Sequence, residues 1–148
     1  MNKQALKIFS LLSLSVMLAV VSVSATPTGS LKAHIPFDFS VGNKTLPAGV
    51  YTVDPYPTPG VLRIRREDCC ASAFVITIPM QAQQKQDQTK LVFHRYGDQY
   101  FLAQSWTAGD SDGRELPQSR TERELVKSRS QHLAKNAVEP EIVCIAAQ

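Results

Sequence analysis

The chain has 148 residues, of which 43% are hydrophobic and 20% charged, and it carries 16 Lys plus Arg against 13 Asp plus Glu. This near balance gives no indication of the strongly basic character typical of nucleic-acid binding, so no nucleic-acid partner is expected. The length suits a single domain with a hydrophobic core of its own.

Residues 1–25 have the pattern of a secretory signal peptide. Lys3 and Lys7 form a short basic start, residues 8–21 are mostly apolar, and small residues precede a cleavage point after Ala25. Because the apolar run is shorter than the roughly 20 residues that span a bilayer, we predict cleavage rather than a retained anchor. We therefore expect an exported protein, periplasmic or extracellular, with no membrane span after signal cleavage.

Residues 26–30 form a polar lead-in, and residues 31–108 have the pattern of a β domain. The stretch 31–41 alternates apolar with polar residues, as a half-buried strand does, and Pro36 indicates an edge strand or a bulge. The run 73–78 is apolar nearly throughout, which predicts a strand covered on both faces. Further strands are expected at 50–54, 61–66, 91–96 and 99–106, the last two joined by a tight Gly97-Asp98 hairpin.

The composition changes after the β domain. Residues 109–118 are predicted to be a loop, in which the stretch DSDG at 110–113 favours a turn because the distal Glu of a calcium loop is missing. A capping-box pattern then predicts a helix at 119–135. The tail 136–148 contains a short apolar strand that we expect to pack on the β domain. The elements together predict a mostly β fold, an antiparallel β-sandwich or small barrel of about seven short strands with one C-terminal helix.

Three cysteines are present, Cys69, Cys70 and Cys144. Adjacent Cα atoms lie only about 3.8 Å apart, too close for ordinary disulfide geometry. At most one bridge is therefore expected, from Cys144 to Cys69 or Cys70, and three reduced thiols remain an equal alternative. The cysteines and histidines lack the paired spacing of a zinc site, so neither a metal nor a cofactor is expected.

The sequence lacks G-x-S-x-G, G-x-G-x-x-G, Walker and H-E-x-x-H motifs. His94 and Tyr96 share one face of a predicted strand, with Asp98 close by, and such a group could support acid–base chemistry. Packing at the hairpin tip is the favoured interpretation because no nucleophile stands near them in sequence. We predict a non-catalytic protein, with a small secreted hydrolase using His94 and a nearby acid such as Asp98 as the alternative.

Two segments resemble a family of small uncharacterised exported bacterial proteins. The stretch IPFDFSVGNKTLPAGVYTV at 35–53 is similar to their opening signature, P-F-x-F-x-V-G-x-x-x-L-P-A-G-x-Y-x-V, and KLVFHRYGDQYFLAQSW at 90–106 is similar to a second block. The resemblance implies an exported β-rich domain. It implies no activity, substrate or functional residue, so none is carried over.

Aromatic and basic residues near the loops are the remaining signal for a ligand. Tyr56 and Trp106 lie beside predicted loops, and Arg63 and Arg65 form a small basic strand face. We expect these four residues to contact a ligand if the protein binds one. The leading hypothesis is an exported binding protein whose partner is a glycan, a peptide or a cell-envelope component. A structural or self-associating envelope protein is a further alternative.

Overall fold

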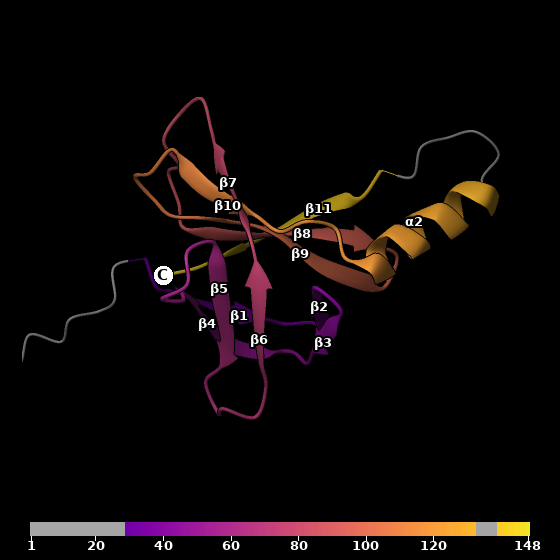
Figure 1. Cartoon of the computed structure of the whole chain (residues 1–148), viewed down its shortest axis with the longest axis horizontal. Helices are drawn as coiled ribbons and strands as arrows, with labels where there is room; N and C mark the ends of the chain where they lie inside the picture. Colours follow the sequence, from indigo (N-terminus) through magenta and orange to yellow (C-terminus); the bar gives the residue numbers. More distant parts are fainter. Residues whose placement is uncertain (1–28, 133–138) are drawn as a thin grey trace, which may run out of the picture.

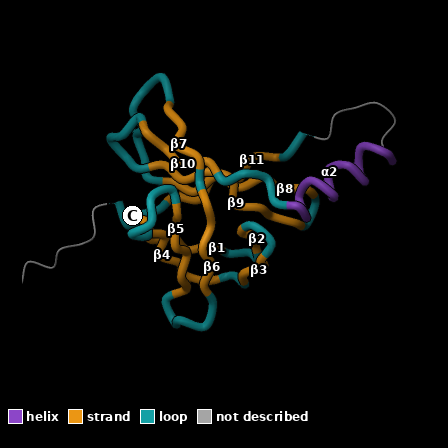
Figure 2. Tube along the Cα trace, in the orientation of Figure 1, coloured by secondary structure: helices purple, strands orange, loops and turns teal. Residues whose placement is uncertain are grey.

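The computed structural model describes residues 29–132 and 139–148, and Figures 1 and 2 show that strands dominate it. The signal-peptide prediction and residues 133–135 of the predicted helix lie outside the described residues. The predicted mostly β class is confirmed. The elements of the described chain are β1 (Leu31–Ile35), β2 (Phe39–Val41), β3 (Lys44–Leu46), β4 (Gly49–Pro55), β5 (Val61–Arg66), β6 (Ser72–Ile76), β7 (Ile78–Gln81), β8 (Lys90–Tyr96), β9 (Gln99–Trp106), β10 (Asp112–Glu115), α2 (Arg120–His132) and β11 (Glu141–Ala146).

The strands form two sheets that share one core. Sheet A has the order β1-β4-β5-β6 and is antiparallel throughout. Sheet B has the order β11-β8-β9-β10-β7, and β2 joins it by a parallel bridge to β9 while pairing with β3. Ile35, Tyr51 and Ile64 of sheet A pack in the same buried cluster as Leu91 and Phe93 of sheet B. The sheets are not closed into a barrel, so the architecture is the sandwich of the two that were predicted.

The alternating stretch at the start of the domain supplies a strand to each sheet. Leu31, Ala33 and Ile35 are buried between exposed neighbours, as the alternation predicts. The expected single strand is nevertheless interrupted after Ile35, because Pro36 has no N–H with which to continue the ladder. Asp38 then accepts a hydrogen bond from the Ala48 N–H at 2.8 Å. The chain thereby leaves β1 in sheet A and enters β2 in sheet B.

The stretch predicted as a loop, 109–118, instead contains β10, which pairs with both β7 and β9. Gly113 makes this pairing possible, since a Cβ there would lie 2.5 Å from the ring of Trp106. The strand escapes prediction because it is polar and glycine-containing and shows no apolar alternation. The described chain has eleven strands rather than about seven, because β3, β7 and β10 are additional and the stretch 31–41 is divided into β1 and β2.

The C-terminal part of the chain packs on sheet B and also reaches sheet A. β11 pairs antiparallel with β8, so the tail lies on the β domain. Lys32 then exchanges two backbone hydrogen bonds with Gln148, at 2.7 and 2.8 Å, which connects the edge of β1 to the end of β11. α2 begins after Ser119, whose Oγ accepts a hydrogen bond from the Glu122 N–H at 3.1 Å. Among the described residues, no helix has the length and apolar character to cross a membrane.

Candidate functional site

Most of the exposed large hydrophobic side chains of the described chain gather on one stretch. Phe74, Ile76 and Ile78 are 59%, 72% and 51% exposed, and they alternate along β6 and the start of β7. Tyr56, 40% exposed, packs edge to face on Phe74 with ring centroids 5.1 Å apart. We call these four residues the apolar edge surface. Clustered exposed apolar side chains of this kind are uncommon on a monomer and mark interaction sites.

The apolar edge surface lies on a free sheet edge. Within the described structure, β6 pairs only with β5 and β7 pairs only with β10. Residues 72–81 therefore run along the edge of sheet A and then along the edge of sheet B. At the crossing, buried Thr77 donates two hydrogen bonds to the Gly60 carbonyl, from its N–H at 2.6 Å and from Oγ1 at 3.0 Å. The prediction that 73–78 is covered on both faces is wrong, because Phe74 and Ile76 are exposed on one face of the strand.

A groove of about 790 Å³ runs beside β6 and separates it from the turn between β2 and β3. Val41, Ala73 and Pro117 contribute to its lining, which is mostly apolar. Lys44 stands at one end, where its Nζ donates a hydrogen bond to the Ser72 carbonyl at 2.6 Å. The groove thus follows a row of backbone groups that β5 does not use.

The basic residues predicted from sequence lie on β5, on the paired side of β6 and outside the lining of this groove. In the antiparallel register, Arg63 lies opposite Phe74 and Arg65 lies opposite Ser72. Arg63 forms an ion pair with Asp54, and the hydrogen bond to that carboxylate raises the pKa of the guanidinium. Asp54 Oδ1 and Arg63 Nε are buried without a hydrogen-bond partner in the described structure. Arg65 forms no ion pair with any described residue, and it leaves an unneutralised cation beside the apolar edge surface.

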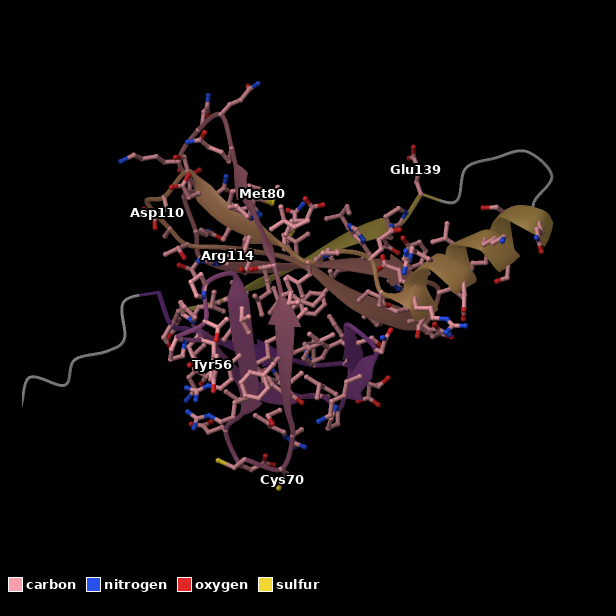
Figure 3. The ribbon with its side chains drawn as sticks, viewed as in Figure 1. Tyr56, Cys70, Met80, Asp110, Arg114 and Glu139 are labelled. Carbon is pink, nitrogen blue, oxygen red and sulfur yellow. The ribbon has the colours of Figure 1, made fainter. Side chains whose placement is uncertain are left out.

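Three of the four predicted ligand contacts, Tyr56, Arg63 and Arg65, therefore lie on sheet A or the loop beside it. Figure 3 shows Tyr56 beside β5 and β6. Trp106 lies apart from them in sheet B, where it is only 7% exposed, rests against Gly113, and donates a hydrogen bond from Nε1 to Gln104 Oε1 at 2.9 Å. The sequence interpretation missed the exposed residues of β6 and β7. Pro79 within β7 was the available signal, since proline inside a strand indicates an edge.

The polar cluster around His94 connects β8 to α2. Glu122 Oε1 lies 3.0 Å from His94 Nδ1 and accepts a hydrogen bond from the Tyr96 hydroxyl at 3.2 Å. Glu122 is only 4% exposed, whereas Asp98 is exposed in the hairpin turn, so the acid beside His94 is Glu122. Burial, the charge of Glu122 and the hydrogen bond to it raise the pKa of Tyr96 to about 12. These three side chains satisfy one another's hydrogen bonds and attach the helix to the sheet.

The three cysteines, all in the described chain, are free and exposed. Cys69 and Cys70 lie in the turn between β5 and β6, and Cys144 lies on β11 in the other sheet. Figure 3 shows Cys70 at the tip of this turn, away from β11. The predicted bridge is therefore not formed in the structure. Residues 29–132 and 139–148 also contain no group of three His, Cys, Asp or Glu side chains placed to hold a metal ion.

No family model matches the chain, and neither the curated proteins nor the solved structures include a significant match to it. The resemblance to small exported bacterial proteins consequently stays a prediction from the sequence.

Proposed function

We propose that the protein is an exported, non-catalytic binding protein that takes up an extended peptide segment of a partner along the free edge of β6. The observation that carries the proposal is the coincidence of an unpaired strand edge with exposed apolar side chains at alternate positions, Phe74, Ile76 and Ile78. An added strand forms main-chain hydrogen bonds with such an edge, while its alternate side chains meet the apolar residues. Five extended residues span about 17 Å, the length of β6.

The protection of this edge is slight. Soluble proteins usually guard a sheet edge with charges, bulges or a covering segment, because an open edge pairs with other chains. Along β6 and β7 the guards in the described structure are Lys44, which contacts one carbonyl, and Pro79. An edge left open in this way, with apolar side chains exposed beside it, favours a role in binding.

The surface suits a peptide better than a glycan. Sugar rings stack on flat aromatic faces that are surrounded by hydrogen-bonding groups. Here the rings of Tyr56 and Phe74 are inclined at 76° to each other, and the remaining members are the aliphatic Ile76 and Ile78. Aliphatic side chains offer a sugar no hydrogen bonds, whereas they pack well against apolar residues of a peptide.

The groove also suits a single strand better than a second copy of this chain. A second β6 would arrive with its own β5 attached, and the turn between β2 and β3 stands on that side of the groove. Lys44 and Arg65 are positive and unneutralised by any described acid, so they favour a peptide with an acidic residue at one end. The expected ligand is an extended peptide with alternate apolar residues and at least one carboxylate.

The test begins with selection of peptides from a random phage-displayed library against the protein, followed by calorimetric measurement of Kd. We expect Ile76→Lys to weaken binding of the selected peptides by about tenfold or more, as loss of a central apolar contact does. The matched control is Ile142→Lys, because Ile142 is 55% exposed on β11 and lies outside the apolar edge surface. Equal loss in both variants, or no loss in Ile76→Lys, would contradict the proposal.

N-methylation of the peptide backbone separates strand addition from side-chain binding alone. The N–H groups of an added strand point alternately to β6 and away from it. Methylation of the N–H groups that point to β6 should abolish binding, and methylation of the others should not. Equal tolerance of both frames rules out strand addition. Analytical ultracentrifugation tests whether a second copy of the chain occupies the edge instead. A wild-type dimer that Ile76→Lys converts to a monomer would assign the edge to a second copy.

A further inference from the structure

A second cavity, of about 620 Å³, opens between the two sheets beside β10. Leu31, Val53 and Leu62, which are buried side chains of β1, β4 and β5, form its apolar wall. Ser105 of β9 and Arg114 of β10 contribute from sheet B. Figure 3 shows Arg114 near the place where β10 passes the end of β5. A volume of this size lies within the range of small-molecule sites, about 300–1,000 Å³.

Arg114 is a half-buried cation without a counter-ion. It lies opposite Ser105 in the register of β9 and β10, and both residues line the cavity. The one hydrogen bond from its side chain to a described residue is long, 3.5 Å from Nη1 to Thr77 Oγ1. All 13 Asp and Glu residues of the sequence lie in the described chain, and none of them forms an ion pair with Arg114. A guanidinium that is partly withdrawn from water gains from an anion that it can hold through two N–H groups.

We propose that this cavity binds a small molecule with one carboxylate and an apolar body. The carboxylate pairs with Arg114, and the apolar body lies against Leu31, Val53 and Leu62. Asp110 and Asp112 also line the cavity, and both are exposed at its rim. Their negative charge disfavours polyanions such as polyphosphates and dicarboxylates, so a single carboxylate is the charge that the site accepts. The cavity is distinct from the edge of β6, and this proposal does not depend on peptide binding there.

Three probes separate the contribution of the carboxylate from that of the apolar body. Decanoate has both groups, decanol lacks the carboxylate, and acetate lacks the apolar body. Binding can be followed by calorimetry and by the fluorescence of Trp106, the one tryptophan of the chain, which rests on Gly113 beside Arg114. We expect saturable binding of decanoate and binding of decanol and acetate that is weaker by about tenfold or more, since each lacks one contact. Phenylbutyrate serves as a second monocarboxylate with a different apolar body.

Arg114→Gln should weaken the binding of decanoate by about tenfold or more, because the charge-assisted hydrogen bonds to the carboxylate are lost. Arg123→Gln is the matched control, because it removes an exposed arginine of α2 that lies outside the cavity. If Arg114→Gln fails to fold, amide chemical shifts of the wild-type protein decide instead: decanoate should perturb Leu31, Val53 and Ser105 and leave Phe74 unchanged. Absence of saturable binding for both carboxylates, equal affinity for decanoate and decanol, or equal affinity of Arg114→Gln and wild type would each overturn the proposal.

Discussion

Glu122 Oε1 lies 3.0 Å from His94 Nδ1, and the Tyr96 hydroxyl donates a hydrogen bond to the same oxygen. One buried carboxylate oxygen on α2 thus serves two partners on β8. The backbone of Glu122 is held as well, since its N–H donates to Ser119 Oγ. Arg129 adds a hydrogen bond from Nη2 to the Tyr96 carbonyl at 3.0 Å. The attachment of the helix to sheet B therefore depends substantially on polar contacts.

Removal of this carboxylate should loosen the helix and destabilise the protein. We expect Glu122→Ala to lower the free energy of unfolding by about 1–3 kcal/mol, because the Tyr96 hydroxyl is left buried without its acceptor. Urea unfolding measures the change. Glu124→Ala is the control, since Glu124 is exposed on α2 and pairs only with exposed Arg120 among the described residues. An equal loss in the two variants would contradict a structural role for the cluster.

Alkaline pH should destabilise the protein through Tyr96. The folded-state pKa of about 12 lies above the ordinary value of 10.0, so the folded protein retains the phenolic proton longer than the unfolded chain does. This contribution to stability is complete below about pH 10 and is lost as the pH rises toward about 12, with a total on the order of 2 kcal/mol. Urea unfolding at increasing pH should show the decline.

Tyr96→Phe provides the control for the pH profile. The variant should lose less stability than wild type over the same alkaline interval. A smaller decline should remain, because burial also raises the pKa of Tyr51. Superimposable profiles for the two proteins would show that Tyr96 does not carry the effect.

Gly113→Ala should destabilise sheet B, because the new Cβ would lie 2.5 Å from the Trp106 ring. We expect a loss of about 1–3 kcal/mol, the usual cost of overpacking, and a shift in tryptophan fluorescence. The double variant with Trp106→Leu tests the cause, since the smaller side chain leaves room for the methyl group. An equal cost of Gly113→Ala in both backgrounds would exclude this contact as the reason.

Cys69→Gly should stabilise the protein. Cys69 has a φ of 59°, in the left-handed region where an L-residue with a Cβ is strained, and glycine relieves a cost of about 1 kcal/mol. Cys70→Gly is a matched control, because Cys70 does not have a positive φ and glycine there only adds freedom to the unfolded chain. Thermal unfolding should therefore show a higher Tm for the first variant and an unchanged or lower Tm for the second. The opposite order would refute the strain argument.

The signal peptide should be removed during export. When the full chain is expressed in a bacterium, the exported fraction should begin at Thr26, since small residues precede a cleavage point after Ala25. Intact mass measurement identifies the new N-terminus. Ala25→Asp should block processing, because a charged residue does not fit a signal-peptidase site. A protein that stays in the cytoplasm with residues 1–25 attached would disprove export.

The parts of the fold that follow from local pattern could be predicted. β1 shows alternation that burial in the structure matches residue by residue, and the Gly97-Asp98 hairpin joins β8 and β9 with Gly97 at a φ of 65°. Strand alternation and turn chemistry are properties of neighbouring residues, so a sequence displays them directly. The capping hydrogen bond between Ser119 and Glu122 likewise joins residues that are close in sequence.

The remaining features depend on residues that are distant in sequence. An apolar run such as 73–78 has the same composition whether one face of its sheet or both are covered, so its exposure depends on which distant segments pack on the sheet. β10 exists because Gly113 admits the ring of Trp106 from another strand. The acid beside His94 is Glu122 on α2, and no spacing rule connects a strand residue with a helix residue that far along the chain.

The pairing of Lys32 with Gln148 has a consequence for how the chain folds. These two residues are far apart in the sequence, so the outer edge of β1 stays unpaired until the chain has been synthesised as far as Gln148. Contacts between such remote positions slow folding, because the entropy cost of closing a large loop comes before the contacts that stabilise it can form. A nascent chain that has not yet reached Gln148 would present β1 to its neighbours with one edge unpaired.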